Sequence, residues 1–270
     1  MPTILKKQKL AENTYLMEID APDVAKKAQP GQFIILRIDE EGERIPLTIA
    51  DFDKKVITLV FLVVGHTTER LSNLKKGDSL LDFVGPLGLP SLIKEYGNVC
   101  LVGGGLGIAP IYPIAKALKK ANNNIITILG AKSKSNLFWE DKFKEISDEL
   151  LIATDDGSKG HKGFVSDLLK ELMGRKKLDL AIAIGPPIMM KVVSDLTRQR
   201  IKTLVSLNPI MIDGMGMCGG CRVIIDGKTK FACVDGPEFN GHKVEWDELI
   251  NRNKFYHEEE HKCKLGGIKK

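Results

Sequence analysis

The sequence Val99-Cys100-Leu101-Val102-Gly103-Gly104-Gly105-Leu106-Gly107-Ile108-Ala109-Pro110 contains the change of pattern that decides the fold. Four apolar residues predict a short buried strand, the glycines a turn, and residues 111–121 an amphipathic helix. A glycine-rich turn from a strand into a helix brings backbone amides and the positive helix end near a diphosphate. The spacing departs from Gly-x-Gly-x-x-Gly, and tight strand–helix packing is an alternative reason for the glycines. The stretch therefore predicts a first βα unit with a nucleotide-binding loop.

Downstream of this loop, short apolar runs alternate with helical patterns. The runs are continuous, as expected of strands buried on both faces, and lie at residues 125–129, 150–153 and 180–184. Helical patterns lie at residues 164–173 and 189–198. This alternation predicts a doubly wound parallel sheet, with residues 97–205 as an α/β nucleotide-binding domain.

Two more loops follow strands of this expected sheet. Thr154-Asp155-Asp156-Gly157 follows one apolar run, and Gly185-Pro186-Pro187 follows another. Ligands of open parallel sheets bind at the carboxyl ends of the strands. We therefore expect both loops to lie beside the glycine loop at one binding edge.

Upstream of the glycine loop, residues 1–96 have β character. Short strand-like runs lie at residues 14–19, 33–38, 56–64 and 80–84. Turn sequences separate them at Pro30-Gly31, Lys76-Gly77-Asp78 and Gly85-Pro86. Short strands with turn signals at this spacing predict a small antiparallel β-barrel.

A third pattern begins after residue 205. The segment Asp213-Gly214-Met215-Gly216-Met217-Cys218-Gly219-Gly220-Cys221 is followed, after eleven residues, by Cys233. This is the spacing of a plant-type iron–sulfur loop with aspartate in place of the first cysteine, and its glycines let the backbone wrap around a cluster. Residues 206–250 therefore form an expected [2Fe–2S] module, and residues 251–270 a C-terminal tail that is expected to be solvated from Glu258 onward. The expected ligands are Asp213, Cys218, Cys221 and Cys233.

Two alternative roles for this segment stay open at the level of sequence. The three cysteines with one further ligand have a spacing compatible with zinc. Asp213 with Gly214 is also a common turn pair. Cys100 stands in an apolar run and is expected to be a buried strand residue. Cys263 stands in the charged tail, where the sequence assigns it no role.

The composition is that of a soluble globular protein. Its 43% hydrophobic and 28% charged residues are ordinary values, and a net charge of +5 with scattered lysines predicts no nucleic-acid surface. No apolar run approaches the ~20 residues that span a bilayer, and no signal peptide is recognisable. Clustered cysteines favour a reducing compartment. We expect a cytoplasmic protein that binds neither nucleic acid nor membrane.

Together these motifs resemble a known family. The barrel, the GGxxGxxP-type loop and a strand ending in Gly-Pro are similar to the ferredoxin–NADP reductase superfamily, and the cluster loop to dihydroorotate dehydrogenase electron-transfer subunits. The narrowest resemblance is to small subunits of NADH-dependent reduced ferredoxin:NADP oxidoreductases, also described as sulfide dehydrogenase subunits. It covers nearly the whole chain and rests on residues 44–51 (RIPLTIAD), 184–190 (IGPPIMM), 217–222 (MCGGCR) and 231–239 (FACVDGPEF).

The resemblance implies an FAD site in the barrel. Thr48 falls where a hydroxyl approaches flavin N5, and Thr67 and Thr68 fall on the segment that holds the FAD diphosphate. Ile45 stands where the family has arginine; Arg44 is one place earlier, and a plain surface role is its alternative. The implied FAD contacts are Arg44, Pro46, Leu47, Thr48, Phe61, Leu62, Val63, Thr67, Thr68, Gly85 and Gly88.

The resemblance also implies an NAD(H) site at the sheet edge. Ile184 replaces the cysteine of many relatives, so no thiol is expected beside the nicotinamide. The residues themselves favour NAD(H) less, because no acid follows the second strand to bind a ribose 2′-hydroxyl, and Lys132 and Lys134 could attract a 2′-phosphate. The implied contacts are Gly103, Gly104, Gly105, Gly107, Ile108, Ala109, Pro110, Asp155, Asp156, Gly185 and Pro186.

The implied function is electron transfer that needs no side-chain acid or base. Flavin converts hydride into single electrons, which an iron–sulfur cluster passes one at a time. By resemblance, the chain exchanges hydride with NAD(H) and electrons with a larger flavin and iron–sulfur subunit, through which ferredoxin is reached, in an electron-bifurcating ferredoxin:NADP transhydrogenase. Electron delivery from dihydroorotate to NAD is the alternative enzyme function, and a zinc-stabilised binding module is the non-enzymatic one.

Overall fold

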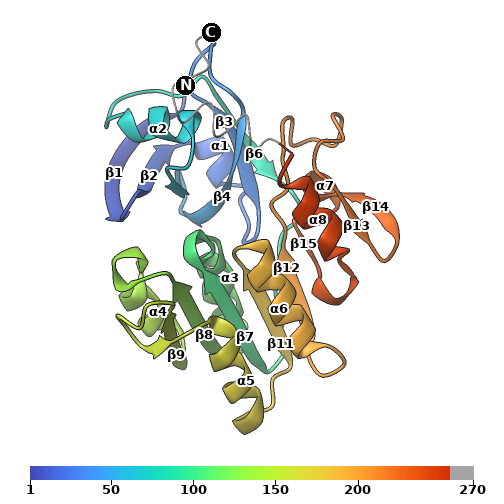
Figure 1. Cartoon of the computed structure of the whole chain (residues 1–270). Helices are drawn as coiled ribbons and strands as arrows, with labels where there is room; N and C mark the ends of the chain where they lie inside the picture. Colours follow the sequence, from blue (N-terminus) through green and yellow to red (C-terminus); the bar gives the residue numbers. More distant parts are fainter. Residues whose placement is uncertain (256–270) are drawn as a thin grey trace.

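The computed structural model describes residues 1–255 of the chain, and the first part of these is an antiparallel barrel (Figure 1). Its strands are β1 (Thr3–Ala11), β2 (Thr14–Asp20), β3 (Phe33–Arg37), β4 (Ile45–Phe52), β5 (Val56–Leu62) and β6 (Asp82–Leu87). Their order is β1-β2-β5-β4-β3-β6, and a bridge between Thr3 and Ser79, just before β6, closes the sheet. Short helices α1 (Pro22–Ala25) and α2 (His66–Asn73) complete this part. The predicted barrel is confirmed.

Strand β3 is buried on both faces. Ile34 and Leu36 are 0% exposed in the barrel core, whereas Phe33 and Ile35 belong to a second core shared with the central sheet. Alternate residues of a strand point to opposite faces, so one apolar run serves two cores. This double burial fixes the barrel against the rest of the molecule.

The central sheet is mostly parallel. Its strands are β7 (Asn98–Gly104), β8 (Asn124–Ala131), β9 (Glu149–Thr154), β10 (His161–Lys162), β11 (Leu180–Ile184), β12 (Lys202–Ser206) and β15 (Glu238–Asn240). The order β10-β9-β8-β7-β11-β12-β15 reverses direction at β7. Ligands of such sheets bind at the carboxyl ends of the strands beside this reversal.

Helices cover both faces of this sheet. One face carries α3 (Ile108–Lys120) and α4 (Glu140–Ile146), and the other carries α5 (Val165–Arg175) and α6 (Pro187–Thr197). Cys100 is 0% exposed within β7, as its apolar run predicted. The doubly wound architecture is confirmed. None of the helices within residues 1–255 has both the length and the apolar character needed to cross a bilayer.

The C-terminal module is joined to this sheet. It contains the hairpin β13 (Arg222–Ile225) and β14 (Lys228–Phe231), helix α7 (Ala232–Asp235), strand β15, and helix α8 (Trp246–Arg252). β15 pairs antiparallel with β12, with Phe239 opposite Val205, which the sequence did not predict. α8 ends at Arg252, inside the tail expected from residue 251. Cys263 and the part of that tail after residue 255 lie outside the described residues.

Two glycine-containing segments differ from expectation. Gly103 and Gly104 end β7, Gly105–Gly107 form a 3-10 turn, and α3 begins at Ile108, so the loop is shorter than the sequence indicated. Gly85-Pro86, expected as a turn, lies within β6 at a shift in its register against β3. An irregularity within a strand carries the same Gly-Pro signal as a turn between strands.

Candidate functional site

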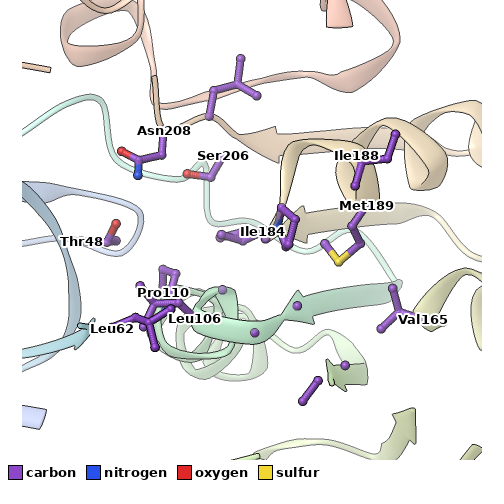
Figure 2. Close-up of a pocket in the computed structure, with 18 of the residues that line it drawn as sticks. Thr48, Leu62, Leu106, Pro110, Val165, Ile184, Ile188, Met189, Ser206 and Asn208 are labelled. Carbon is purple, nitrogen blue, oxygen red and sulfur yellow. The ribbon is translucent and has the colours of Figure 1, made fainter. Parts of the chain in front are cut away.

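A cavity of about 890 Å³ lies between the barrel and the carboxyl edge of the central sheet. β4 and β5 contribute one wall, the β7–α3 turn and the start of α6 another, and the segment after β12 a third (Figure 2). Its size is within the range of small-molecule and cofactor sites. The predicted residues that line it are Pro46, Leu47, Thr48, Leu62, Gly104, Gly105, Gly107, Pro110, Asp155, Gly185 and Pro186. The structure thus brings the predicted flavin and nucleotide segments to one space.

The barrel wall of the cavity is largely apolar. Pro46 and Leu47 of β4 and Leu62 at the end of β5 line it, and Thr48 adds a hydroxyl. Figure 2 shows Thr48 on the left of the view, on the same side as Asn208, with Met189 and Val165 on the right. An apolar wall with a few placed polar groups is typical of a pocket for a flat ring system.

Two glycines of the β7–α3 turn have different roles. A Cβ on Gly107 would lie 2.0 Å from the carbonyl oxygen of Ile184 and 2.9 Å from the nitrogen of Gly185. Gly105 has φ +56°, and no heavy atom lies within 4 Å of its Cβ position. Tight packing therefore explains Gly107, whereas the open main chain at Gly105 is free to approach a ligand.

The first turn of α3 meets the cavity with main-chain groups. Ile108 and Ala109 are 0% exposed and pack into the core, while Pro110 lines the cavity. No side chain of the described residues caps this helix start. Unpaired N–H groups at a helix N-terminus favour an anion. Ile108 and Ala109 would therefore contact a phosphate only through the main chain.

Two charged side chains, Asp155 and Lys132, line the cavity. Asp156 does not line it; its Oδ1 accepts hydrogen bonds from the Ser158 hydroxyl at 2.6 Å and the Ser158 N–H at 2.9 Å. These bonds hold the pKa of Asp156 below its usual range. A carboxylate and an ammonium group in the lining suit the ribose and phosphate parts of a nucleotide.

Several predicted cofactor residues lie away from the cavity. Arg44 is 3.2 Å from Asp82 Oδ2, and the Thr67 hydroxyl donates to Glu43 Oε2 at 2.7 Å. The Thr68 hydroxyl accepts backbone N–H groups at the start of α2. The remaining predicted positions that do not line the cavity are Phe61, Val63, Gly85, Gly88, Gly103, Ile108, Ala109 and Asp156.

Strand alternation and packing account for two of these positions. Phe61 is 1% exposed in the barrel core, because its neighbour Leu62 points into the cavity. Gly88 is required by packing, since a Cβ there would lie 2.8 Å from Phe33 and 2.9 Å from Pro237. The family resemblance identified the right segments of the chain. Within each segment, strand alternation and packing determine which side chains reach the cavity.

Asp213 organises the predicted cluster loop. Its Oδ1 accepts the Met215 N–H at 2.8 Å, and its Oδ2 accepts the N–H groups of Met217 at 3.0 Å and Cys218 at 2.6 Å. These donors, Met215 first, hold the pKa of Asp213 below its usual range. The loop is thus folded around an ionised carboxylate.

Cys221 and Cys233 lie close together, with their Sγ atoms 3.2 Å apart, and are 2% and 1% exposed; Cys218 is exposed. The N–H of Gly220 lies 3.4 Å from Cys218 Sγ, and the N–H of Cys233 lies 3.5 Å from Cys221 Sγ. Burial raises the pKa of the Cys233 thiol to about 12, and a bound metal would deprotonate it. Thiolates that accept amide hydrogen bonds are the donor set of an iron–sulfur cluster.

The four predicted ligands belong to one module, but their side chains are not grouped around a single point. Within the part of the chain that the structure describes, no three His, Cys, Asp or Glu side chains are grouped as a metal site requires. Asp213 is directed at its own loop N–H groups, and only Cys221 and Cys233 are in contact. One carboxylate and three thiols are nevertheless a donor set that fits an iron–sulfur cluster.

The cluster loop begins at the cavity wall. Met211 lines the cavity, and Asp213 follows two residues later. A Cβ on Gly214 would lie 2.8 Å from Ile35 Cγ1 and from Leu87 Cδ1, so the loop packs directly on β3 and β6. The two sites are therefore neighbours that share a short piece of chain.

Two domain families match the chain: the oxidoreductase NAD-binding domain at residues 101–195, and the iron–sulfur cluster binding domain of dihydroorotate dehydrogenase B at residues 208–245. An electron transfer subunit homolog of dihydroorotate dehydrogenase B from Thermotoga maritima is 55% identical over 260 residues, covering 95% of this chain and 92% of that protein. The Desulforamulus reducens subunit is 37% identical over 249 residues, covering 88% and 95%. This chain belongs to the family of dihydroorotate dehydrogenase B electron transfer subunits.

Solved structures agree with this membership. A structure described for flavin-based electron bifurcation by NADH-dependent reduced ferredoxin-NADP oxidoreductase is 52% identical, covers 100% of this electron transfer subunit and 98% of its own chain, and has a TM-score of 0.94. Phthalate dioxygenase reductase, at 16% identity, 83% and 86% coverage and a TM-score of 0.64, shares the fold. The resemblance inferred from the residues is confirmed. The chain is an oxidoreductase subunit with an NAD-binding and an iron–sulfur-binding domain.

Sequence reasoning missed part of this family member's cavity. Ser206 ends β12 and Asn208 follows it, and the sequence of β12 is too polar to stand out as a buried strand. The rule that ligands meet strand ends would have found them once β12 was recognised. Leu106 of the predicted loop and Ile184, expected beside the nicotinamide, also line the cavity. Further lining side chains that were missed include Phe33, Val60, Phe164, Ile188, Met189 and Val192.

Proposed function

We propose that this chain is the NAD(H)-side electron transfer subunit of an electron-bifurcating ferredoxin:NADP oxidoreductase. The observation that carries the proposal is the continuity of the cavity with the cluster loop through residues 206–213. A space for hydride transfer joined to a module for single electrons is what such a subunit requires. The 52% identical structure of NADH-dependent reduced ferredoxin-NADP oxidoreductase supports this assignment.

The cavity residues divide the work of binding and orientation. Residues 46–48 would hold FAD from the barrel side, and Gly105 and Gly185 would leave room for a nicotinamide nucleotide on the sheet side. FAD, when bound, converts hydride into single electrons, which the cluster passes one at a time. Leu62 and Ile184 line the space with apolar side chains, which would exclude water from between the two bound groups. Hydride transfer needs no proton donor, so no acid–base residue is assigned.

The cluster would be held by one carboxylate and three thiolates, from Asp213, Cys218, Cys221 and Cys233. Asp213→Ala would remove a ligand and the acceptor of three loop N–H groups, so the cluster should become labile while FAD stays bound. Asp213→Cys should keep a [2Fe–2S] centre with a changed spectrum and potential. An unchanged cluster in Asp213→Ala would make Asp213 a turn residue only.

The larger flavin and iron–sulfur subunit, through which ferredoxin is reached, is assigned to the rim of the cluster loop. Apolar side chains are exposed there: Ile212 is 56%, Met215 51%, Met217 84% and Val234 41% exposed. Electrons must leave where the cluster comes closest to the surface, beside exposed Cys218. Met217→Glu should therefore weaken co-purification of the partner without removing the cluster. Free thiols in the described residues fit a reducing, cytoplasmic location.

A visible spectrum and metal analysis of the purified protein test this function. Flavin bands with a broad cluster absorbance support it, whereas a colourless zinc protein contradicts it. The names of the curated relatives favour a second function, transfer of electrons from dihydroorotate to NAD. Co-purification separates the two: a dihydroorotate-oxidising partner selects the second, and a partner that reduces NADP with ferredoxin selects the first.

A further inference from the structure

The last residue of helix α8 reaches into the cluster loop. Arg252 Nη2 donates a hydrogen bond to the carbonyl oxygen of Gly220 at 3.2 Å. Gly220 lies between Cys218 and Cys221, the central pair of predicted ligands. The Arg252 side chain is only 15% exposed, although it belongs to the segment that the sequence assigned to the C-terminal tail.

The surroundings of Arg252 are built to hold its charge. Glu248, one turn earlier on α8, places Oε1 3.6 Å from Arg252 Nε, and the guanidinium lies 5.7 Å from the ring centroid of Phe255. Arg252 Nε and Glu248 Oε2 are nevertheless buried without hydrogen-bond partners in the described residues. A largely buried ion pair whose atoms lack some hydrogen-bond partners adds little to stability. The placement of Arg252 is therefore better explained by a role other than stability.

The position beside the ligands gives that reason. The potential of an iron–sulfur cluster depends on nearby charge, hydrogen bonding and exposure. Reduction adds negative charge to a centre that already has a carboxylate among its expected ligands, and a cation nearby stabilises the reduced form. A hydrogen bond to Gly220 also fixes the turn that presents Cys218 and Cys221.

We propose that Arg252 is a positioning residue for the [2Fe–2S] cluster: it fixes the Cys218–Cys221 turn through the Gly220 carbonyl, and its charge raises the cluster's reduction potential. This inference rests on the proposed function, because it requires that the chain holds the cluster.

The test compares variants of the cluster-loaded chain by redox titration followed by electron paramagnetic resonance, and by the rate of cluster loss to a chelator. Arg252→Met should move the potential to a more negative value and speed cluster loss. Arg252→Lys keeps the charge but not the planar fork, so it should restore much of the potential and less of the cluster's lifetime. Arg175→Met is the matched control, since Arg175 also ends a helix and has a glutamate four residues earlier, on α5.

The outcomes separate this inference from the function beneath it. A wild-type chain that holds no [2Fe–2S] cluster overturns the proposed function. A wild-type cluster whose potential and lifetime are the same in Arg252→Met overturns the inference alone. If Arg252→Met holds no cluster, Arg252→Lys and the charge-neutral Arg252→Gln are compared instead. A cluster in Arg252→Lys with a reduction potential near the wild-type value supports the role of the charge. A reduction potential in Arg252→Lys that is as far from wild type as that of Arg252→Gln overturns the inference.

Discussion

The cavity and the cluster loop are neighbours that use different parts of the chain. At the cavity, main chain at strand ends and apolar side chains form the walls, and Gly107 leaves no room for a Cβ beside Ile184. At the cluster loop, side chains provide the structure, because Asp213 accepts three N–H groups and the cysteines provide the sulfurs. Removing a side chain should therefore matter most in the loop, and adding volume should matter most at the cavity.

The largest expected effect is loss of a thiolate from the loop. Cys221→Ser should abolish the cluster, since a hydroxyl is a poor ligand for soft iron, while FAD binding and flavin reduction by NADH persist. Iron content and the visible spectrum measure this. Cys100→Ala, at a thiol buried in β7 away from the loop, is the control and should keep the cluster. A full cluster in Cys221→Ser would contradict the claim that side chains, rather than main chain, provide the structure of the cluster loop.

Added volume should have the next largest effect. Gly107→Ala would place a Cβ 2.0 Å from the Ile184 oxygen, so the β7–α3 turn must shift away from β11. We expect a loss of about 1–3 kcal/mol in the free energy of unfolding, together with weaker NADH binding and an intact cluster. Urea unfolding and NADH titration measure these.

Gly174 provides the matched control for Gly107. It lies in α5, and no heavy atom is within 4 Å of its Cβ position. Gly174→Ala should stabilise the protein by about 0.5–1 kcal/mol because alanine favours the helix. Equal effects at the two glycines would show that helix propensity, rather than the close contact with β11, governs Gly107.

A smaller effect concerns the junction that holds the two regions together. The Ser91 hydroxyl donates to Glu238 Oε1 at 2.5 Å, and burial raises the pKa of Glu238 above its usual 4.5; Tyr96, whose own pKa burial raises, is the other titratable group nearby. Because the folded pKa exceeds the unfolded one, this carboxyl's contribution to stability is present below about pH 4.5 and is lost as pH rises through the folded pKa.

Glu238→Gln should remove that pH dependence. In urea unfolding, the variant should gain stability over the parent at mildly alkaline pH and show no such gain at acidic pH. Parallel pH profiles for the two proteins would mean that Glu238 does not titrate with folding, and that the junction is held by packing alone.

The smallest expected effect is at Lys132. This side chain lines the cavity, and NADH has no 2′-phosphate for its ammonium group to bind. The chain should have a higher kcat/KM with NADH than with NADPH, and Lys132→Ala should lower the value for NADPH while that for NADH changes little. A higher kcat/KM with NADPH in the parent protein would contradict the assigned nucleotide.

Local patterns in the sequence were enough to predict the barrel, the doubly wound sheet and the cluster segment. What they could not give depends on contacts between distant residues. β15 has only three residues, and its place beside β12 depends on pairing across more than thirty residues of chain. Arg252 looked like part of a charged tail, because nothing near it in sequence indicates that α8 packs beside Gly220. Residues that act through the main chain, such as Gly105, cannot be recognised from the chemistry of a side chain.

The central claim is that hydride enters at the cavity and single electrons leave through the neighbouring loop. Anaerobic addition of NADH to the purified, cofactor-loaded chain, followed by visible absorption and electron paramagnetic resonance, tests it most directly. We expect bleaching of the flavin bands together with the signal of a reduced [2Fe–2S] cluster, and flavin bleaching alone in Cys221→Ser. Flavin bleaching in the wild-type chain with a cluster that stays oxidised would contradict the claim.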